Sequence, residues 1–177
     1  MSLIHLLATT GHRLTWPLKI VMCLLILSNT SLADKLVIPP EYVIKYSAKM
    51  AYKDFPKQAD ILAIIRVESA FNPKAFNPEK SKINPNRKIP PSIGLMQVQN
   101  GTFNPKHNMK QGTSLLREYY VKYCNRSIEC AVKSYNIGPR NFKHGKLKKS
   151  GAIYFNKYQY HRARYDKFVE KLTTHVN

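Results

Sequence analysis

Hydrophobic and polar positions follow a helical period in two segments after residue 40. In residues 41–53, positions 42, 43, 46, 50 and 51 are apolar or aromatic, which predicts a helix with one buried face. Residues 54–56, Asp-Phe-Pro, interrupt this pattern, and a second helix is predicted to contain the apolar run 61–67. We therefore expect two helices at the start of the folded domain.

The second half of the chain continues this period. Residues 109–123 carry leucine and tyrosine side chains near helical spacing, and residues 128–135 predict a short helix that ends before Gly138 and Pro139. The segment 152–176 is aromatic and basic and is also predicted to be helical. Because no two-residue alternation typical of strands is sustained, we predict an all-α single domain without internal repeats.

A long basic loop follows the second predicted helix. Residues 72–92 contain five of the eleven prolines and five lysine or arginine side chains. Loops of this length in a compact domain are usually functional or disordered. The short segment 92–98 comes next, with Gly94 as a hinge and Gln97 as its polar tip.

The first 33 residues have the features of an export signal. A basic start, an apolar core of about eight residues and the pattern Ser31-Leu32-Ala33 predict cleavage before Asp34. The core is shorter than the roughly 20 residues of a membrane span, although an uncleaved anchor stays an alternative. Residues 34–177 would then form one domain in the periplasm or outside the cell, long enough for one hydrophobic core.

The chain is strongly basic. Its formal charge is +19, and removal of the leader's two cations, Arg13 and Lys19, leaves +17. Such a charge favours a polyanionic neighbour, which can be a wall polymer, an anionic lipid or a nucleic acid. Because tyrosines interleave the cations of the C-terminal segment, a secreted cationic binding protein is an alternative to an enzyme. The export signal makes nucleic acid the less expected partner.

The predicted domain has two cysteines, Cys124 and Cys130. In an oxidising compartment this pair could close a small disulfide loop, whereas in a reducing one it would more often be two unrelated thiols. The six histidines show no short ligand spacing with either cysteine, so no metal site is predicted.

Glu68 is the carboxyl group with the most unusual surroundings. In a helix, Ile61, Ile64 and Ile65 lie seven, four and three residues before it, so the carboxyl continues an apolar stripe. Loss of hydration there would raise its pKa, and a raised pKa suits a general acid near neutral pH. The alternatives are a surface glutamate at a frayed helix end and a buried glutamate paired with Arg66 or a lysine.

Four ordered motifs resemble the soluble lytic transglycosylase family over about residues 41–160. They are Glu68-Ser69-Ala70-Phe71-Asn72-Pro73, Gly94-Leu95-Met96-Gln97, Asn108 with Gly112, and Tyr135-Asn136-Ile137-Gly138-Pro139. The resemblance implies a lysozyme-like all-α fold that cuts the glycan strands of peptidoglycan between N-acetylmuramic acid and N-acetylglucosamine.

The resemblance also implies a mechanism centred on Glu68. This residue would protonate the leaving glycosidic oxygen and then, as a carboxylate, take the proton of the muramyl C6 hydroxyl to give a 1,6-anhydro product. The substrate's acetamido group would stabilise the cationic carbon, so that neither a second carboxylate nor a cofactor is needed. The aspartate and glutamate residues of the predicted domain are consistent with a single catalytic carboxylate, because none besides Glu68 lies in a motif. Glu79 is expected to be a solvated charge in the basic loop.

The other motif residues are expected to bind or orient the glycan. Gln97 and Asn136 offer amide groups to sugar hydroxyls and acetamido groups, and Tyr135 offers a hydroxyl on a flat apolar ring. The structural alternatives are a helix cap for Asn136 and a core aromatic for Tyr135.

Three further residues are assigned on the same resemblance. Ser69 would hold the Glu68 carboxyl or satisfy the helix end, and Met96 would form a cleft wall or pack in the core. Tyr154 begins a late Tyr-x-x-Lys segment, whose tyrosine in the family lies close to the catalytic glutamate.

Two departures from the family leave details open. Leu115 stands where the family often has tyrosine, and the proline-rich insert 78–92 looks longer than usual, which leaves the shape of the glycan subsites and the product length undetermined. A hydrolytic lysozyme is the nearest enzymatic alternative. The small size also suits a role in conjugation, secretion or phage-entry machinery, with general wall turnover as the other option.

Overall fold

The computed structural model describes residues 36–78 and 89–174. The predicted signal peptide 1–33, its alternative as a membrane anchor, and the loop residue Glu79 lie outside the described residues. The chain divides into two units, Met1–Val37 and Ile38–Asn177, and every helix and strand described belongs to the second.

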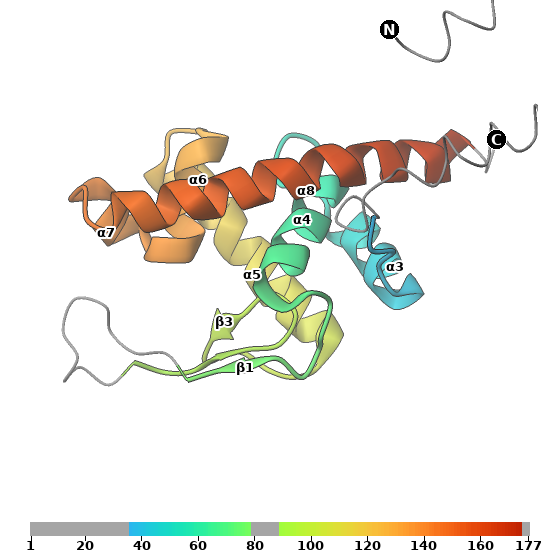
Figure 1. The fold of residues 1–177 in the computed structure, drawn as a ribbon, viewed down its shortest axis with the longest axis horizontal. Helices are drawn as coiled ribbons and strands as arrows, with labels where there is room; N and C mark the ends of the chain where they lie inside the picture. The colour runs from blue at the N-terminus through green and yellow to red at the C-terminus, as the bar shows by residue number, and fades with distance from the viewer. Residues whose placement is uncertain (1–35, 79–88, 175–177) are drawn as a thin grey trace, which may run out of the picture. The chain divides into compact units, whose positions relative to one another are not determined.

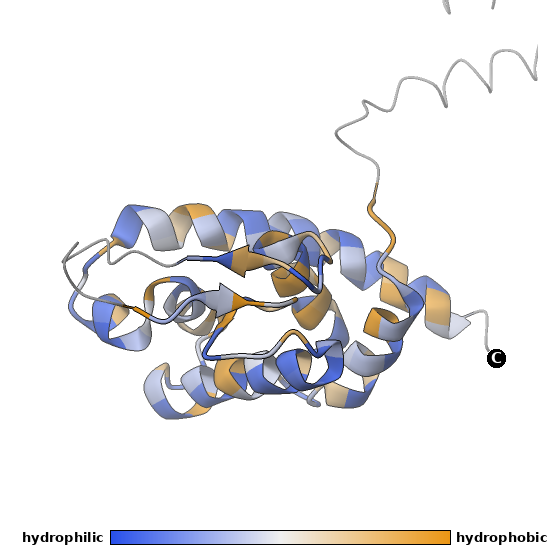
Figure 2. Cartoon of the chain, turned by 90° about the horizontal axis from the view of Figure 1, so that it is seen from below, coloured by the Kyte–Doolittle hydropathy of each residue, from blue (hydrophilic) through white to orange (hydrophobic). Residues whose placement is uncertain are grey.

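Helices form most of the second unit, which confirms the predicted all-α class (Figure 1). In chain order they are α3 (Glu41–Met50), α4 (Gln58–Ser69), α5 (Pro105–Glu118), the π-helical turn η2 (Tyr119–Tyr123), α6 (Ile128–Ile137), α7 (Pro139–Lys143) and α8 (Lys148–Thr174). Figure 2 shows hydrophobic residues set between hydrophilic ones along the helices, as expected of helices that bury one face.

Two predicted helix ends were wrong. The first helix stops at Met50 instead of residue 53, because Ala51 takes an extended conformation with φ −65° and ψ 143°. The last helix begins at Lys148, four residues before the predicted segment. Its first turn reads Lys-Lys-Ser-Gly, so hydrophobic periodicity gives no signal there.

A small antiparallel sheet, absent from the sequence prediction, flanks the basic loop. It consists of β1 (Phe76–Asn77), β2 (Ser92–Ile93) and β3 (Val98–Gln99) in the order β1-β2-β3, with Phe76 opposite Ile93 and Ile93 opposite Val98. Strands of two residues are too short to show an alternating pattern. The sheet brings the segment after α4 beside the Gly94–Gln97 segment.

Helix α4 lies at the centre of the core. Seven consecutive residues, from Ala59 to Ile65, are buried, which requires neighbours on every side of the helix. Helix α8 packs against both α4 and α6, and its buried positions are Gly151, Tyr154, Tyr158 and Tyr165 (Figure 1). These positions recur at intervals of three, four and seven residues, so one face of α8 points to the core.

A buried carboxylate ties the start of α4 to α8. Asp60, which is 3% exposed, accepts hydrogen bonds from the Tyr158 hydroxyl at 2.7 Å and from the Lys57 backbone N–H at 2.7 Å. Arg162 Nε lies 3.3 Å from the Asp60 Oδ1 atom without hydrogen-bond alignment, so it contributes mainly charge. Burial raises the pKa of Asp60, although all three neighbours act in the opposite direction.

The two cysteines of the domain are paired. Cys124 and Cys130 form a disulfide that closes the loop between η2 and α6, with a Cα–Cα distance of 5.5 Å. The loop residue Ser127 caps α6, since its hydroxyl accepts the backbone N–H of Cys130 at 3.3 Å.

Candidate active site

Glu68 meets a tyrosine from the far end of the chain. It is the penultimate residue of α4 and is half-buried. The hydroxyl of Tyr154, a 6% exposed residue of α8, donates a hydrogen bond to Glu68 Oε1 at 2.5 Å. The predicted neighbourhood of these two residues is therefore present, and two packed helices fix it.

The tyrosine hydroxyls around Glu68 hold their protons firmly. Burial raises the pKa of Tyr154 well above its ordinary value, and the charge of Glu68 and the hydrogen bond to it add to the rise. The pKa of Tyr135 is likewise raised well above its ordinary value by burial, and then by the charges of Glu68 and Tyr119. Both phenols are hydrogen-bond donors at neutral pH, and a negative charge at Glu68 acts on both.

Tyr135 directs its proton at a backbone carbonyl. Its hydroxyl donates to the Met96 carbonyl oxygen at 2.7 Å, which connects α6 to the Gly94–Gln97 segment. The Met96 side chain is fully buried, and Thr113 Oγ1 lies 3.7 Å from its sulfur atom. Met96 thus packs in the core, the second of the two roles predicted for it.

A buried asparagine explains the third motif. Asn108 of α5 donates to the Ile93 carbonyl at 2.7 Å and accepts the Met96 backbone N–H at 2.8 Å. A side chain at Gly94, where φ is 78°, would place its Cβ 2.5 Å from Asn108 Nδ2. Asn108 therefore holds the Gly94–Gln97 segment in shape. Asn108 belongs to the third sequence motif, which by itself indicates no role for it.

Gly112 lies one turn after Asn108 on the same face of α5. A Cβ atom there would come within 2.6 Å of Met96 Cβ and 2.8 Å of the Tyr135 hydroxyl. Because Gly112 has no side chain, α5 can pack closely against the hydrogen bond between the Tyr135 hydroxyl and the Met96 carbonyl. The glycine of the third motif therefore makes room for the contact between the second and the fourth motif.

Gln97 is bound through its amide nitrogen. Nε2 donates to the Gly94 carbonyl at 2.9 Å and to the Ala75 carbonyl at 3.2 Å, and the backbone φ of Gln97 is 48°. Since a glutamine amide has two N–H groups, both are occupied and a ligand would meet the amide oxygen.

Asn136 and Ser69 make structural contacts. The Asn136 Oδ1 atom accepts a hydrogen bond from the Ser150 hydroxyl at 3.2 Å, which fixes the orientation of the amide, and the amide nitrogen offers two donors to a ligand. The single hydroxyl proton of Ser69 is donated to the Ile65 carbonyl at 3.2 Å. Of the two roles predicted for Ser69, this is the satisfaction of the helix end.

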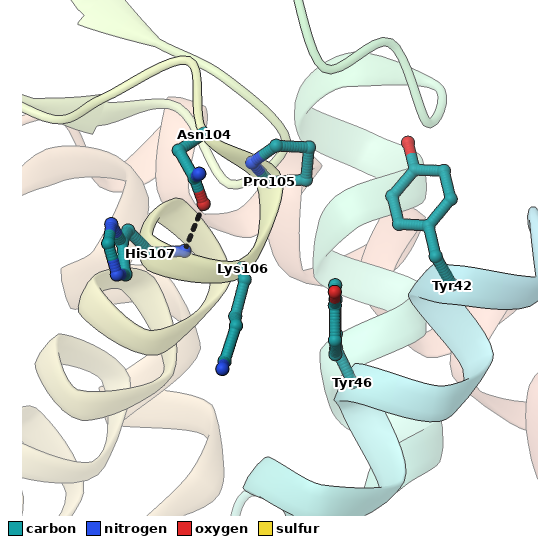
Figure 3. Close-up of a pocket in the computed structure, with 6 residues that line it drawn as sticks. All are labelled: Tyr42, Tyr46, Asn104, Pro105, Lys106 and His107. Atoms are coloured by element: carbon teal, nitrogen blue, oxygen red, sulfur yellow. Dashed lines mark hydrogen bonds between the residues drawn. The ribbon is translucent and has the colours of Figure 1, made fainter.

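A separate hollow of about 300 Å³ lies between α3 and the start of α5. Figure 3 shows Tyr42 and Tyr46 projecting from α3 beside the residues that open α5, where the Asn104 side chain accepts the His107 backbone N–H at 3.1 Å. None of the predicted site residues lines this hollow. This hollow is therefore separate from the predicted site around Glu68.

In the part of the chain that the structure describes, no three histidine, cysteine, aspartate or glutamate side chains are grouped so that they could hold a metal ion. No helix in the same residues combines the length and the apolar character needed to traverse a bilayer.

Comparison with known protein families identifies a match over most of the folded domain. A family model described as Transglycosylase SLT domain matches residues 45–157, which begin within α3, end within α8 and include all four motifs. Searches among curated proteins and among solved structures found no match.

Proposed function

Because the chain belongs to the transglycosylase SLT domain family, with its lysozyme-like and mostly helical fold, we propose that it is a lytic transglycosylase in which Glu68 is the catalytic acid and base. The family assignment supports a transglycosylase that acts on peptidoglycan. The proposal adds the reaction course and the roles of individual residues. The observation that carries it is the hydrogen bond of 2.5 Å between Tyr154 and Glu68 at the end of a buried helix.

In the first step, protonated Glu68 gives its proton to the oxygen that joins N-acetylmuramic acid to N-acetylglucosamine. The bond between this oxygen and the muramyl C1 atom breaks, and the acetamido oxygen of the same sugar bonds to C1. The leaving sugar departs with a hydroxyl group. Glu68 is then a carboxylate, the form that a donated hydrogen bond from Tyr154 stabilises.

In the second step, the Glu68 carboxylate removes the proton of the muramyl C6 hydroxyl. The C6 oxygen bonds to C1 as the acetamido oxygen leaves, which gives a 1,6-anhydro sugar and restores the protonated acid. No water is consumed, so the enzyme needs one carboxyl group where an inverting glycosidase needs two.

The amide groups supply complementary contacts for the glycan. With its N–H groups bonded to backbone carbonyls, Gln97 offers an acceptor to a sugar hydroxyl or an acetamido N–H. With its oxygen bonded to Ser150, Asn136 offers a donor to an acetamido carbonyl or a hydroxyl. Tyr135 orients the segment that carries Gln97, since its hydroxyl binds the Met96 carbonyl.

Mass spectrometry of purified peptidoglycan after digestion tests the proposal. The expected products are muropeptides with 1,6-anhydro ends, each lighter by one water than a hydrolytic product. Glu68→Gln should abolish their release without loss of the fold, because the amide keeps the shape but is not an acid. Glu118→Gln, at a helix position that pairs with Lys122, is the control and should keep full activity.

Other results would redirect the assignment. Reducing ends formed with water would support the hydrolytic lysozyme instead, and activity of Glu68→Gln would remove Glu68 from the mechanism. Salt-sensitive DNA binding without muropeptide release would support the cationic binding protein. We further propose a periplasmic or secreted location, supported by the signal-like leader 1–33, and a role in secretion or conjugation machinery stays a prediction.

A further inference from the structure

The outer side of α8 carries a line of positive charges. At about 100° per residue, Tyr154, Tyr158 and Tyr165 define the core-facing side of this helix. A sector roughly 80° wide, whose middle lies about 120° around the helix axis from the core-facing side, holds seven residues, which we call the outer stripe. The outer stripe consists of Lys149, Ile153, Lys157, Tyr160, Arg164, Lys167 and Lys171.

No carboxylate shares the outer stripe. The two acids of α8, Asp166 and Glu170, fall outside its sector, and Asp166 pairs with Arg162 at 3.0 Å. Among the ion pairs of residues 36–78 and 89–174, none includes Lys149, Lys157 or Lys167. These three lysines are exposed, so their charges face solvent without compensation.

The geometry of the outer stripe suits a flat surface. From Lys149 to Lys171 it spans 22 residue steps, or about 33 Å along a single helix. Along the helix axis, successive cations are about 4.5 to 12 Å apart, so only those from Arg164 to Lys171 lie within the Debye length of about 8 Å at physiological salt, while the whole row can contact one extended surface.

Two apolar groups lie between the cations. Ile153 is 49% exposed and Tyr160 is 47% exposed. An aliphatic side chain gains nothing from contact with a hydrated polyanion, whereas both residue types are favourable at the boundary between lipid head groups and acyl chains. The combination of lysines with an exposed isoleucine and tyrosine is therefore complementary to an anionic bilayer.

Nucleic acid fits the outer stripe less well. Binding of single strands uses open aromatic rings on which bases stack. The Tyr160 ring already has the Arg164 guanidinium 5.1 Å from its centre, and Arg164 Nη1 donates to the Tyr160 hydroxyl at 2.9 Å. The one aromatic ring of the outer stripe is thus engaged by its neighbour.

We propose that the outer stripe of α8 docks the protein on anionic lipid membranes. The contact is peripheral and reversible, since it rests on surface charges and two shallow apolar side chains. Tyr154, which binds Glu68, projects from the same helix at about 100° around its axis from the middle of the outer stripe. A docked molecule would therefore hold the Glu68 region to one side of the lipid contact.

Co-sedimentation of the full chain with vesicles tests this proposal. One set of vesicles contains phosphatidylglycerol in phosphatidylcholine, and the other contains phosphatidylcholine alone. The triple variant Lys149→Gln, Lys157→Gln, Lys167→Gln should bind the anionic vesicles about 100-fold more weakly, since each cation near such a surface contributes about fivefold. The wild-type chain should prefer the anionic vesicles and lose binding as salt is added.

A charge-matched control separates the outer stripe from net charge. The variant Lys45→Gln, Lys49→Gln, Lys110→Gln removes three exposed lysines from α3 and α5 and should stay within a few-fold of the wild type. Ile153→Ser should weaken binding at high salt as well as at low salt, because its contribution is apolar. Far-UV circular dichroism checks the fold of each variant.

Three results would overturn the proposal. Equal losses in both triple variants would show that overall charge alone attracts the chain. Tighter binding to duplex DNA, with the same dependence on the three stripe lysines, would assign the outer stripe to nucleic acid. Binding that is unchanged in the stripe variant would place the contact elsewhere. Because Glu68→Gln should bind vesicles like the wild type, this test is independent of the proposed enzymatic function.

Discussion

Among single residues, Tyr154 has the most direct influence on the proposed acid. Its hydroxyl binds the Glu68 carboxyl at 2.5 Å and keeps its own proton at neutral pH because burial and the adjacent charge raise its pKa. A donor in this position favours the ionised carboxyl and fixes its orientation. Tyr154 thus supports the middle of the proposed reaction, where Glu68 carries the charge.

Replacement of Tyr154 by phenylalanine should change the pH dependence of catalysis. Loss of the donor makes the ionised carboxyl less favourable, so the basic limb of the kcat/KM profile should move to higher pH. The rate at neutral pH should fall roughly ten- to hundredfold, the range expected for a hydrogen bond to a charged group. Tyr165→Phe, at a buried position further along α8, is the control and should leave the profile in place. An unshifted limb in Tyr154→Phe would separate this tyrosine from the ionisation of the acid.

Asp60 makes the stability of the fold depend on pH. Its pKa is raised from an ordinary value of 3.8, so its stabilising contribution is present below that pH and is lost as the pH rises through the folded-state pKa. The side chain of Asp60→Asn cannot ionise. Its amide hydrogens face the Lys57 N–H, so this donor loses its partner, and the free energy of unfolding falls by about 1–3 kcal/mol. In urea denaturation, the loss of unfolding free energy caused by Asp60→Asn, relative to the wild type, should therefore be smaller at pH 7 than at pH 3.5. A penalty that grows toward neutral pH would show that Tyr158 and Arg162 outweigh the burial of the charge.

On the scale of secondary-structure elements, Asn108 connects α5 to the segment Gly94–Gln97. Asn108→Ala would leave the Met96 N–H and the Ile93 carbonyl without their buried partners, at about 1–3 kcal/mol for each group. Thermal denaturation should show a lower Tm, and muropeptide release should fall because Gln97 loses its fixed position. Asn108→Asp keeps the acceptor for Met96 and should retain more stability than alanine at low pH, where the aspartic acid can also donate. Equal loss in both variants at low pH would contradict this role.

Prediction from sequence succeeded for elements with a long periodic pattern. The run 61–67 identified α4, and the stop signals Gly138 and Pro139 identified the end of α6. The sheet could not be predicted, because its two-residue strands depend on Asn108 and Gln97 contacts between segments distant in sequence. The same limit applies to the site. Motif order indicated Glu68 and Tyr154, but which amide atoms of Gln97 and Asn136 are occupied depends on backbone partners that no local pattern reveals.

On the scale of the whole molecule, the formal charge of +19 should control access to the substrate. Peptidoglycan carries carboxylates on its peptide stems, and attraction between a basic protein and this polymer is screened by salt. The rate of muropeptide release from insoluble sacculi should fall several-fold between low ionic strength and about 0.5 M salt. Cleavage of a short, uncharged glycan oligomer should change little over this range. A parallel decline with both substrates would indicate an effect on the enzyme itself.

The bond between Tyr154 and Glu68 joins positions 86 residues apart, and its tyrosine lies on the last helix. A nascent chain that has emerged through α7 already contains all four motifs, yet it lacks Tyr154, the phenol that donates a hydrogen bond to its acid. Activity should therefore arise late in synthesis, when α8 docks on α4. Latency of this kind would follow from chain order alone, because Tyr154 comes 86 residues after the acid.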